Sequence, residues 1–193
     1  LGTGETLIQQ TFRRLTKICP PENIFVVTHN QYFEQVMEQL PEMRPEHVLC
    51  EPMRRNTAPC IAYAAYKISK INPDARIVVA PSDHIILKEE SFTEIIESAL
   101  QAATDNDWLL TLGITPNRPD TGYGYIQFID DKVEKLNKIS KVKTFTEKPD
   151  LEMAKFFLQT GEFLWNAGIF IWNLKSILKA FDEHLPEMSA IFK

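Results

Sequence analysis

The residues best placed to do chemistry are Ser82, Asp83 and His84, which directly follow a short apolar run. Residues 77–80 are Ile-Val-Val-Ala, a run too short for a helix and typical of a strand buried on both faces of a parallel sheet. Pro81 cannot donate to a sheet ladder, so we expect the strand to stop there. Open α/β sheets bind ligands beyond the carboxyl ends of their strands. At that edge Asp83 is either a ligand for a hard cation or a cap for the following turn, and its position favours neither.

The stretch from Glu51 to Pro59 is a second candidate, because it lacks apolar periodicity and carries two prolines and two arginines beside Asn56 and Thr57. One interpretation is a surface loop in which Asn56 or Thr57 caps the next helix. The functional interpretation is a base-recognition loop. There the Glu51 carboxylate accepts hydrogen bonds from purine N–H groups, while amide and hydroxyl groups fix the edge of the base. A helix N-terminus at Ala58 would add free N–H donors for an anion.

Two further stretches carry groups that suit a sugar or a phosphate. Residues 121–125 are Thr-Gly-Tyr-Gly-Tyr. Their glycines indicate either a tight turn that needs a positive φ, or close approach of the backbone to a polar ligand with the tyrosines as walls. Glu147 and Lys148 follow a later predicted strand. They form either an exposed charge pair of little energetic weight, or a contact from Glu147 to sugar hydroxyls and from Lys148 to a phosphate.

Asn166, followed by Ala167 and Gly168, lies in an otherwise aromatic stretch that includes Trp165 and Phe170. An amide without a partner would be costly there, so we expect a hydrogen-bond partner from the protein or from a ligand. The four histidines have no ligand spacing, which favours core or surface roles over zinc. The three cysteines include no CxxC pair, which favours buried free thiols in a reducing compartment.

Composition limits the classes of partner. The 193 residues suit one domain or one domain with a small appendage, and 44% hydrophobic with 24% charged residues is typical of a globular protein. The net charge of −5 argues against non-specific binding of nucleic acid, which needs a basic face. No apolar run approaches the roughly 18 residues that a membrane span requires. We therefore expect no nucleic-acid and no membrane partner and a cytoplasmic location. The oligomeric state stays open, with a homodimer as one option.

Short apolar runs alternate with helical patterns in the first part of the chain, which predicts βαβ units and a largely parallel sheet with helices on both faces. The predicted strands span residues 24–28, 47–50, 77–80 and 108–112, and the predicted helices residues 6–15, 32–40, 60–69 and 95–103. From Gly113 the pattern changes, and residues 125–129 and 142–146 alternate as half-exposed antiparallel strands do. The prediction ends with a helix over 151–158, capped by Asp150 and stopped near Gly161, a strand over 169–172 and a helix over 174–181.

The order of the motifs is more specific than any one of them. Along the chain they are Glu51-Pro-x-x-x-Asn-Thr-Ala-Pro59, Val79-Ala-Pro-Ser-Asp-His84, Gly122-Tyr-Gly-Tyr-Ile126, Phe145-Thr-Glu-Lys-Pro149 and Trp165-Asn-Ala-Gly-Ile-Phe170. In this order the chain resembles the mannose-1-phosphate guanylyltransferases, or GDP-mannose pyrophosphorylases, of the sugar nucleotidyltransferase family, over essentially its whole length. The resemblance implies an α/β fold, a Rossmann-like three-layer sandwich with a mixed, mainly parallel central sheet, in one nucleotidyltransferase domain over residues 1–193. It also implies GTP and mannose 1-phosphate as substrates and Mg²⁺ as cofactor.

The resemblance also implies roles for individual residues. Asp83 would bind the metal ion and, with Lys148, would be catalytic. Contacts to the nucleotide are implied for Glu51, Asn56, Thr57, Ala58, Pro81, Ser82 and Asp83. Contacts to the sugar or its phosphate are implied for Gly124, Tyr125, Glu147, Lys148, Asn166 and Gly168.

Two parts of the family pattern are not found in the 193 residues. The family's glycine-rich loop, Gly-Gly-x-Gly-x-Arg-Leu with a lysine downstream, cradles the triphosphate, and Gly2-Thr3-Gly4 lacks the arginine that should follow. The family's second metal-binding aspartate is expected beyond Lys193. We therefore expect an internal fragment, truncated at both ends and not competent for catalysis by itself.

Two alternatives stay open at this point. One is a sister sugar-1-phosphate nucleotidyltransferase with another base or sugar, and the other is a non-catalytic nucleotide-sugar-binding module of the same fold. The glycine-rich loop, encoded upstream of Leu1, would favour the enzyme. A NAD-dependent dehydrogenase is disfavoured, because no predicted strand is followed by GxGxxG.

Overall fold

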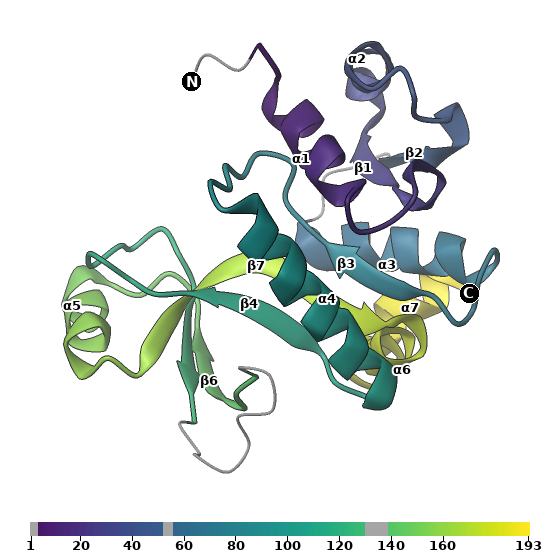
Figure 1. Cartoon of the computed structure of the whole chain (residues 1–193). Helices are drawn as coiled ribbons and strands as arrows, with labels where there is room; N and C mark the ends of the chain where they lie inside the picture. The colour runs from purple at the N-terminus through teal and green to yellow at the C-terminus, as the bar shows by residue number, and fades with distance from the viewer. Residues whose placement is uncertain (1–3, 52–55, 130–138) are drawn as a thin grey trace. The chain divides into compact units, whose positions relative to one another are not determined.

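The computed structural model describes residues 4–51, 56–129 and 139–193 (Figure 1). The chain divides into two compact units: unit 1 comprises Leu1–Leu109 and Ile171–Lys193, and unit 2 comprises Leu110–Phe170. Among the described residues, no helix has the length and apolar character needed to cross a membrane.

The first part of unit 1 is built on two parallel strands, β1 (Val26–His29) and β2 (Val48–Glu51), whose register pairs His29 with Glu51. Helices α1 (Leu7–Leu15) and α2 (Phe33–Gln39) pack apolar side chains against a core formed by Ile24, Val36, Leu40, Met43 and Val48. The 3₁₀ turns η1, η2 and η3 span Pro21–Asn23, Asn30–Tyr32 and Pro45–His47.

Helix α1 begins with a reciprocal cap that fixes its first turn. The Thr6 hydroxyl accepts a hydrogen bond from the backbone N–H of Gln9 at 3.4 Å, and the Gln9 side chain accepts one from the N–H of Thr6 at 2.9 Å. This capping box satisfies two N–H groups that the helix itself cannot pair.

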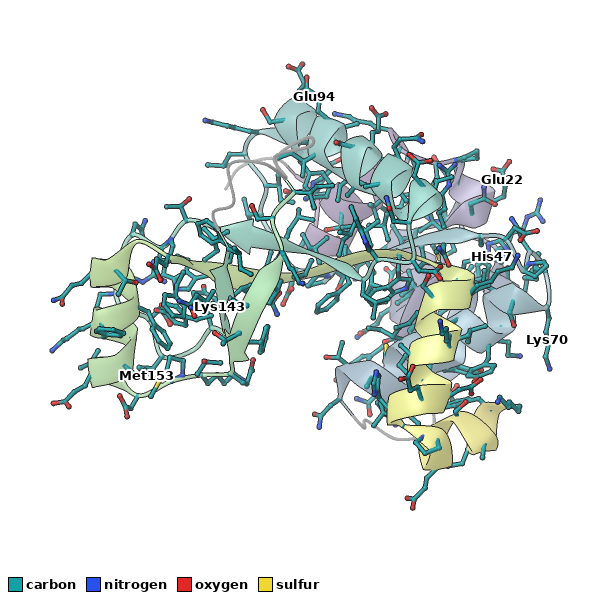
Figure 2. The ribbon with its side chains drawn as sticks, turned by 90° about the horizontal axis from the view of Figure 1, so that it is seen from below. Glu22, His47, Lys70, Glu94, Lys143 and Met153 are labelled. Atoms are coloured by element: carbon teal, nitrogen blue, oxygen red, sulfur yellow. The ribbon has the colours of Figure 1, made fainter. Side chains whose placement is uncertain are left out.

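The second part of unit 1 places helices around strand β3 (Arg76–Val79). Its helices are α3 (Thr57–Ser69), α4 (Glu89–Asp105), α6 (Leu174–His184) and α7 (Pro186–Phe192). Helix α4 contacts β3, whereas α3, α6 and α7 contact one another. Figure 2 shows α4 on one side of the strand and α6 and α7 on the other, which is the layering expected of an α/β unit.

Unit 2 contains β4 (Leu110–Ile114), β5 (Tyr125–Phe128), β6 (Val142–Thr146), α5 (Leu151–Thr160) and most of β7 (Phe163–Asn173). Strand β5 pairs antiparallel with both β6 and β7, with Tyr125 opposite Thr146 on one side and Trp165 on the other. The aromatic core beneath this sheet consists of Tyr125, Ala154, Phe157, Phe163 and Trp165.

Helix α5 confirms the predicted caps. The Asp150 carboxylate accepts a hydrogen bond from the N–H of Met153 at 2.8 Å, and Gly161 ends the helix in the left-handed region at φ 69°. Both caps depend on neighbouring residues alone, which is why the local sequence predicts them.

The α/β class and the mixed sheet are confirmed, with differences in detail. The larger sheet has the order β3-β7-β5-β6 with β4 also paired to β7, while β1 and β2 form a separate pair. Strand β3 was predicted to be buried on both faces, but its apolar residues are only partly buried. Strand β7 begins at Phe163, six residues before the prediction, because burial alternates along it in strand periodicity from Phe163 onward.

Candidate active site

Asp83 lies on a turn just beyond the end of β3, as predicted. The side chains of Ser82 and Asp83 are exposed, and His84 is half-buried. Within the described ranges the Asp83 carboxylate has no hydrogen-bond or ion-pair partner, so it does not cap the following turn. The carboxylate is therefore free to bind a ligand.

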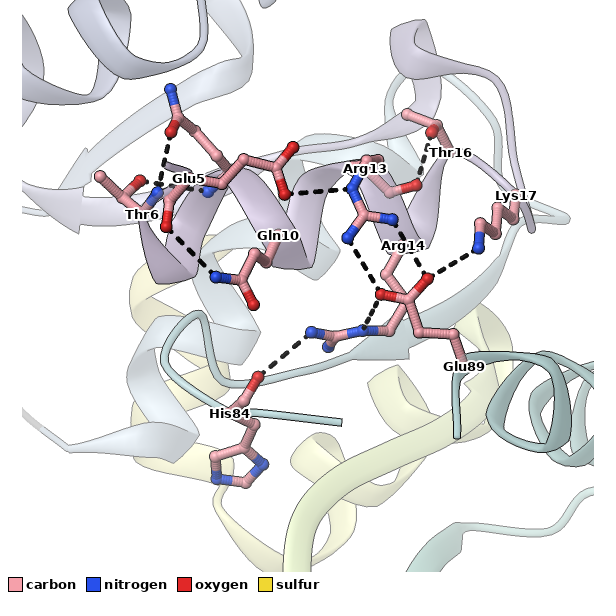
Figure 3. A network of polar contacts seen from close by, with 10 residues as sticks. Glu5, Thr6, Gln10, Arg13, Arg14, Thr16, Lys17, His84 and Glu89 are labelled. Carbon is pink, nitrogen blue, oxygen red and sulfur yellow. Dashed lines mark hydrogen bonds and ion pairs between the residues drawn. The ribbon is translucent and has the colours of Figure 1, made fainter. Parts of the chain in front are cut away.

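The backbone on both sides of Asp83 is held by helix α1. The Thr11 hydroxyl donates a hydrogen bond to the carbonyl oxygen of Ser82 at 3.3 Å. The Arg14 guanidinium donates one to the carbonyl oxygen of His84 at 3.2 Å (Figure 3). The backbone carbonyls of Ser82 and His84, on either side of the exposed Asp83, are therefore both hydrogen-bonded to side chains of α1.

The donor set at this turn suits Mg²⁺ held jointly with phosphate. No group of three or more His, Cys, Asp or Glu side chains that could enclose a metal ion occurs in the described part of the chain. Mg²⁺ commonly uses only one or two carboxylates and takes its other ligands from water and substrate phosphates. A single free carboxylate at Asp83 fits that pattern, whereas a closed structural zinc site would need four ligands.

The predicted nucleotide residues of unit 1 lie around the start of α3. Glu51 is the last residue of β2, and α3 begins at Thr57, three residues before the prediction. Burial, followed by the charge of Glu51, raises the pKa of the Cys60 thiol in the first turn of α3 to about 11. Residues 52–55 lie outside the described residues.

The predicted capping of α3 by a side chain is wrong for Asn56. This residue occupies the N-cap with φ 67°, but its side chain makes no capping hydrogen bond. Asn56 and Thr57 are exposed, and Ala58 is half-buried in the first turn. Asn tolerates the left-handed region better than most residues, so the backbone can turn at this position.

In unit 2 the loop before β5 is organised by Asp120, which sequence reasoning missed. Its carboxylate accepts hydrogen bonds from the N–H of Gly122 at 2.9 Å and from the Arg118 guanidinium at 2.7 Å. These contacts, the Gly122 bond first, lower the pKa of Asp120. The Tyr125 hydroxyl donates to the carbonyl oxygen of Asp120 at 2.9 Å and accepts from its N–H at 3.0 Å.

Tyr125 is therefore a residue of the unit 2 core. Its side chain is fully buried in the aromatic core, and its hydroxyl is occupied by Asp120. A sugar contact of Tyr125 stays a prediction, while its side chain shapes the loop that precedes Gly124. Tyr123, by contrast, is exposed and has its ring 5.0 Å from that of Trp165, with the Arg118 guanidinium 5.2 Å from the same indole.

Gly124, Glu147 and Asn166 come together in unit 2. The N–H of Asn166 donates to the carbonyl oxygen of Gly124 at 2.8 Å. A Cβ on Gly124 would lie 2.8 Å from Glu147 Oε2 and 2.9 Å from Phe145 Cζ, so only glycine leaves room for the carboxylate. Glu147 and Lys148 are exposed, with Oε1 and Nζ 3.5 Å apart.

The Asn166 amide finds its expected partner inside the protein. Its Oδ1 accepts from the N–H of Gly168 at 3.2 Å and lies 2.9 Å from the Thr111 hydroxyl. Gly168 has φ 66°, a conformation that favours glycine. The amide nitrogen of Asn166 has no partner among the described residues, so it remains available to a ligand.

Unit 1 also has a surface hollow that none of the predicted site residues lines. Its volume is about 440 Å³, and its lining residues are Gly4, Glu5, Gln9, Phe12, Arg13, Thr16, Gln39, Leu40, Pro41 and Glu42. The hollow is bounded by α1 and by the residues that end and follow α2.

The chain thus combines an α/β unit, with the Asp83 carboxylate beyond a strand end, and a second unit with polar groups gathered around Gly124. The family described as nucleotidyl transferase matches residues 1–193, and the chain belongs to that family.

The relatives are more specific than the family. Two curated proteins named mannose-1-phosphate guanylyltransferase are 36% identical over 188 residues (Sinorhizobium fredii) and 35% identical over 185 residues (Klebsiella pneumoniae). Each match covers 95% of this chain, which spans 36% and 39% of the two relatives. A crystal structure described as a mannose-1-phosphate geranyltransferase from Thermus thermophilus has a TM-score of 0.88 at 28% identity, over 100% of this chain and 54% of that one.

Proposed function

We propose that the protein carrying this chain transfers the guanylyl group of GTP to mannose 1-phosphate, giving GDP-mannose and pyrophosphate. The observation that carries this proposal is the identity of 35–36% with mannose-1-phosphate guanylyltransferases over 95% of the chain. The free Asp83 carboxylate beyond β3 supports it, because the resemblance requires a metal ligand at that position. We further propose that the reaction takes place in the cytoplasm.

On the nucleotide side, the chain offers Glu51 and the first turn of α3. A carboxylate only accepts hydrogen bonds, and the Watson–Crick edge of guanine presents two neighbouring N–H donors. Glu51 would therefore select guanine over adenine, which presents an acceptor at the ring nitrogen of that edge. The exposed Asn56 and Thr57 side chains would complete the contact to the base or ribose.

The nucleophile comes from mannose 1-phosphate. A phosphate monoester has a second pKa of about 6, so at neutral pH its oxygen is mostly ionised already. That oxygen attacks the α-phosphorus in line, the bond from this phosphorus to the bridging oxygen breaks, and pyrophosphate leaves with the electron pair. No general base is required, so the protein must chiefly align two anions and reduce their repulsion.

The chain's own residues supply alignment and charge. Asp83 would hold Mg²⁺ together with phosphate oxygens. When bound there, Mg²⁺ neutralises phosphate charge and orients the two substrates. Lys148 would place a positive charge near the sugar phosphate, while Glu147 and the free amide nitrogen of Asn166 would bond to sugar hydroxyls.

A substrate panel tests the proposal. The purified full-length protein that carries this chain is given Mg²⁺ with each pair drawn from GTP, ATP, UTP or dTTP and mannose 1-phosphate or glucose 1-phosphate, and pyrophosphate release is measured. GTP with mannose 1-phosphate should be preferred by roughly 10-fold or more, because a polar site rejects a mismatched hydrogen-bonding edge. Preference for another pair would assign a sister enzyme, and binding without turnover would indicate a non-catalytic module.

The variant Glu51→Gln examines base recognition alone. The amide keeps the size of the side chain but presents a donor where guanine also has donors. We expect kcat/KM for GTP to fall by roughly 10-fold or more, while that for ATP changes little. Equal losses for both nucleotides would remove Glu51 from base recognition.

A further inference from the structure

Two polar side chains of α1 are buried against the connection between β3 and α4, residues 80–88. Thr11 is 5% exposed and Arg14 is 2% exposed. They are three positions apart, so they lie on the same face of the helix. Their contacts are the carbonyl oxygens of Ser82 and His84, the two residues that flank Asp83.

Packing alone does not explain a buried arginine at this position. Burial lowers the pKa of Arg14, which shows that the charged group loses hydration here. Its Nε atom has no hydrogen-bond partner among the described residues, and Glu89 lies 4.0 Å away. An apolar side chain of similar size commonly serves stability as well as a buried charge or better. The guanidinium also lies 5.7 Å from the centre of the Phe92 ring, but its hydrogen bond to His84 is the contact that links it to the turn of Asp83.

The same helix also holds the far end of this connection. Glu89, the first residue of α4, receives hydrogen bonds from both terminal nitrogens of Arg13 at 3.1 Å and from Lys17 at 2.7 Å (Figure 3). These partners are more exposed than Thr11 and Arg14. Helix α1, with Lys17 just after it, thus contacts Ser82, His84 and Glu89, whereas the Asp83 carboxylate has no partner among the described residues.

We propose that Thr11 and Arg14 are positioning residues that fix the backbone on both sides of Asp83 so that its carboxylate is aimed at the metal ion. The inference rests on the proposed function, because it assumes that Asp83 binds Mg²⁺. Residues that orient a metal ligand typically change metal affinity or activity by about 10–100-fold when they are removed. The hydroxyl of Thr11 and the guanidinium of Arg14 act through the Ser82 and His84 carbonyls and touch no substrate atom.

Thr11→Val is the cleanest variant, since it removes the hydroxyl and keeps the branched shape. Thr11→Ser restores a hydroxyl and serves as the rescue. Thr16→Val is the matched control, because the Thr16 hydroxyl bonds only within its own helix, to the carbonyl oxygen of Arg13. Arg14→Met is the second test, removing the donor while keeping an unbranched chain in the core.

The Mg²⁺ requirement separates positioning from general stability. It should rise in Thr11→Val and in Arg14→Met and stay unchanged in Thr16→Val. The Mg²⁺ concentration that gives half-maximal pyrophosphate release should rise by about fivefold in Thr11→Val, the equivalent of one neutral hydrogen bond. It should return to the original value in Thr11→Ser.

A double variant that joins Thr11→Val to Asp83→Asn tests whether Thr11 acts through the Asp83 carboxylate. If Thr11 acts through the carboxylate, Thr11→Val should add nothing to the Mg²⁺ requirement of Asp83→Asn. An unchanged Mg²⁺ requirement in Thr11→Val, or an equal change in both backgrounds, would overturn the inference. Near-normal turnover by Asp83→Asn alone would instead overturn the metal role in the proposed function, so the two failures can be told apart.

Discussion

Replacing Gly124 by alanine should disable the sugar side of the site while unit 2 stays folded. The added Cβ would lie 2.8 Å from Glu147 Oε2 and 2.9 Å from Phe145 Cζ, where ordinary contacts begin at 3.4 Å. Both groups must therefore retreat by about half an ångström or more. They are the ends of side chains that are 58% and 50% exposed, and Gly124 does not have a positive φ, so the backbone can keep its path.

The size of the effect follows from that displacement. A misplacement of about 1 Å can reduce catalysis by roughly 100-fold. If Glu147 binds the sugar as proposed, a displacement of half that distance should cost about 10-fold in kcat/KM for mannose 1-phosphate. The free energy of unfolding should change by less than about 1 kcal/mol, because exposed side chains can move aside. The KM for GTP should stay the same.

Gly113→Ala is the matched control for Gly124→Ala. Its Cβ would lie 2.5 Å from Leu164 Cδ1 and 2.9 Å from Leu164 Cβ, and this Cβ cannot swing away from its strand. We expect a loss of about 1–3 kcal/mol in urea unfolding, with KM values of the folded fraction unchanged. Steady-state kinetics in both substrates and urea titrations compare the two variants. If Gly124→Ala kept normal kcat/KM for mannose 1-phosphate, or lost activity only in proportion to stability, the reasoning about Glu147 would be refuted.

Two further predictions concern stability. Tyr125→Phe should lower the free energy of unfolding by about 1–3 kcal/mol, because it leaves the N–H and carbonyl of Asp120 without their buried partner, and urea unfolding measures the loss. Hydrogen bonds from Lys17 and Arg13 lower the pKa of Glu89, so its stabilising contribution is present above the unfolded pKa of about 4.3 and is lost as the pH falls through the lower folded value. The free energy of unfolding of the original protein should therefore exceed that of Glu89→Gln by the same amount near neutral pH, and this difference should shrink below about pH 4. A difference that stays the same below about pH 4 would contradict the stabilising role of the ionised Glu89 carboxylate.

Local sequence signals predicted the parts of the fold that depend on neighbouring residues. Asp150 and Gly161 were identified as caps because a side chain bonds within its own turn and because glycine accepts a left-handed stop. The turn that carries Asp83 was predicted because Pro81 ends the apolar run of β3. In both places the information lies within a few residues.

Features that depend on distant partners were not predicted. Within the aromatic stretch from Phe163 to Trp172, only residues 169–172 were predicted to form a strand. Pairing with β5 makes it one long strand. The buried network of Asp120 and Tyr125 likewise appears only when the loop folds back onto the sheet.

The polar face of α1 shows the same limit. Periodicity predicted the helix from its apolar residues and gave Thr11 and Arg14 no role beyond it. Their partners, the carbonyls of Ser82 and His84, lie about 70 positions away in the chain. No local pattern distinguishes Arg14, which is buried, from Arg13, which is exposed.

The most direct test of the central claim is pyrophosphate release from GTP and mannose 1-phosphate by the Asp83→Asn protein in the presence of Mg²⁺. Turnover should fall by roughly 100-fold with an unchanged urea unfolding curve, because the variant removes a carboxylate that has no partner among the described residues. Asp105→Asn, which changes an exposed carboxylate at the end of α4, should keep normal turnover. Near-normal turnover by Asp83→Asn would contradict the account.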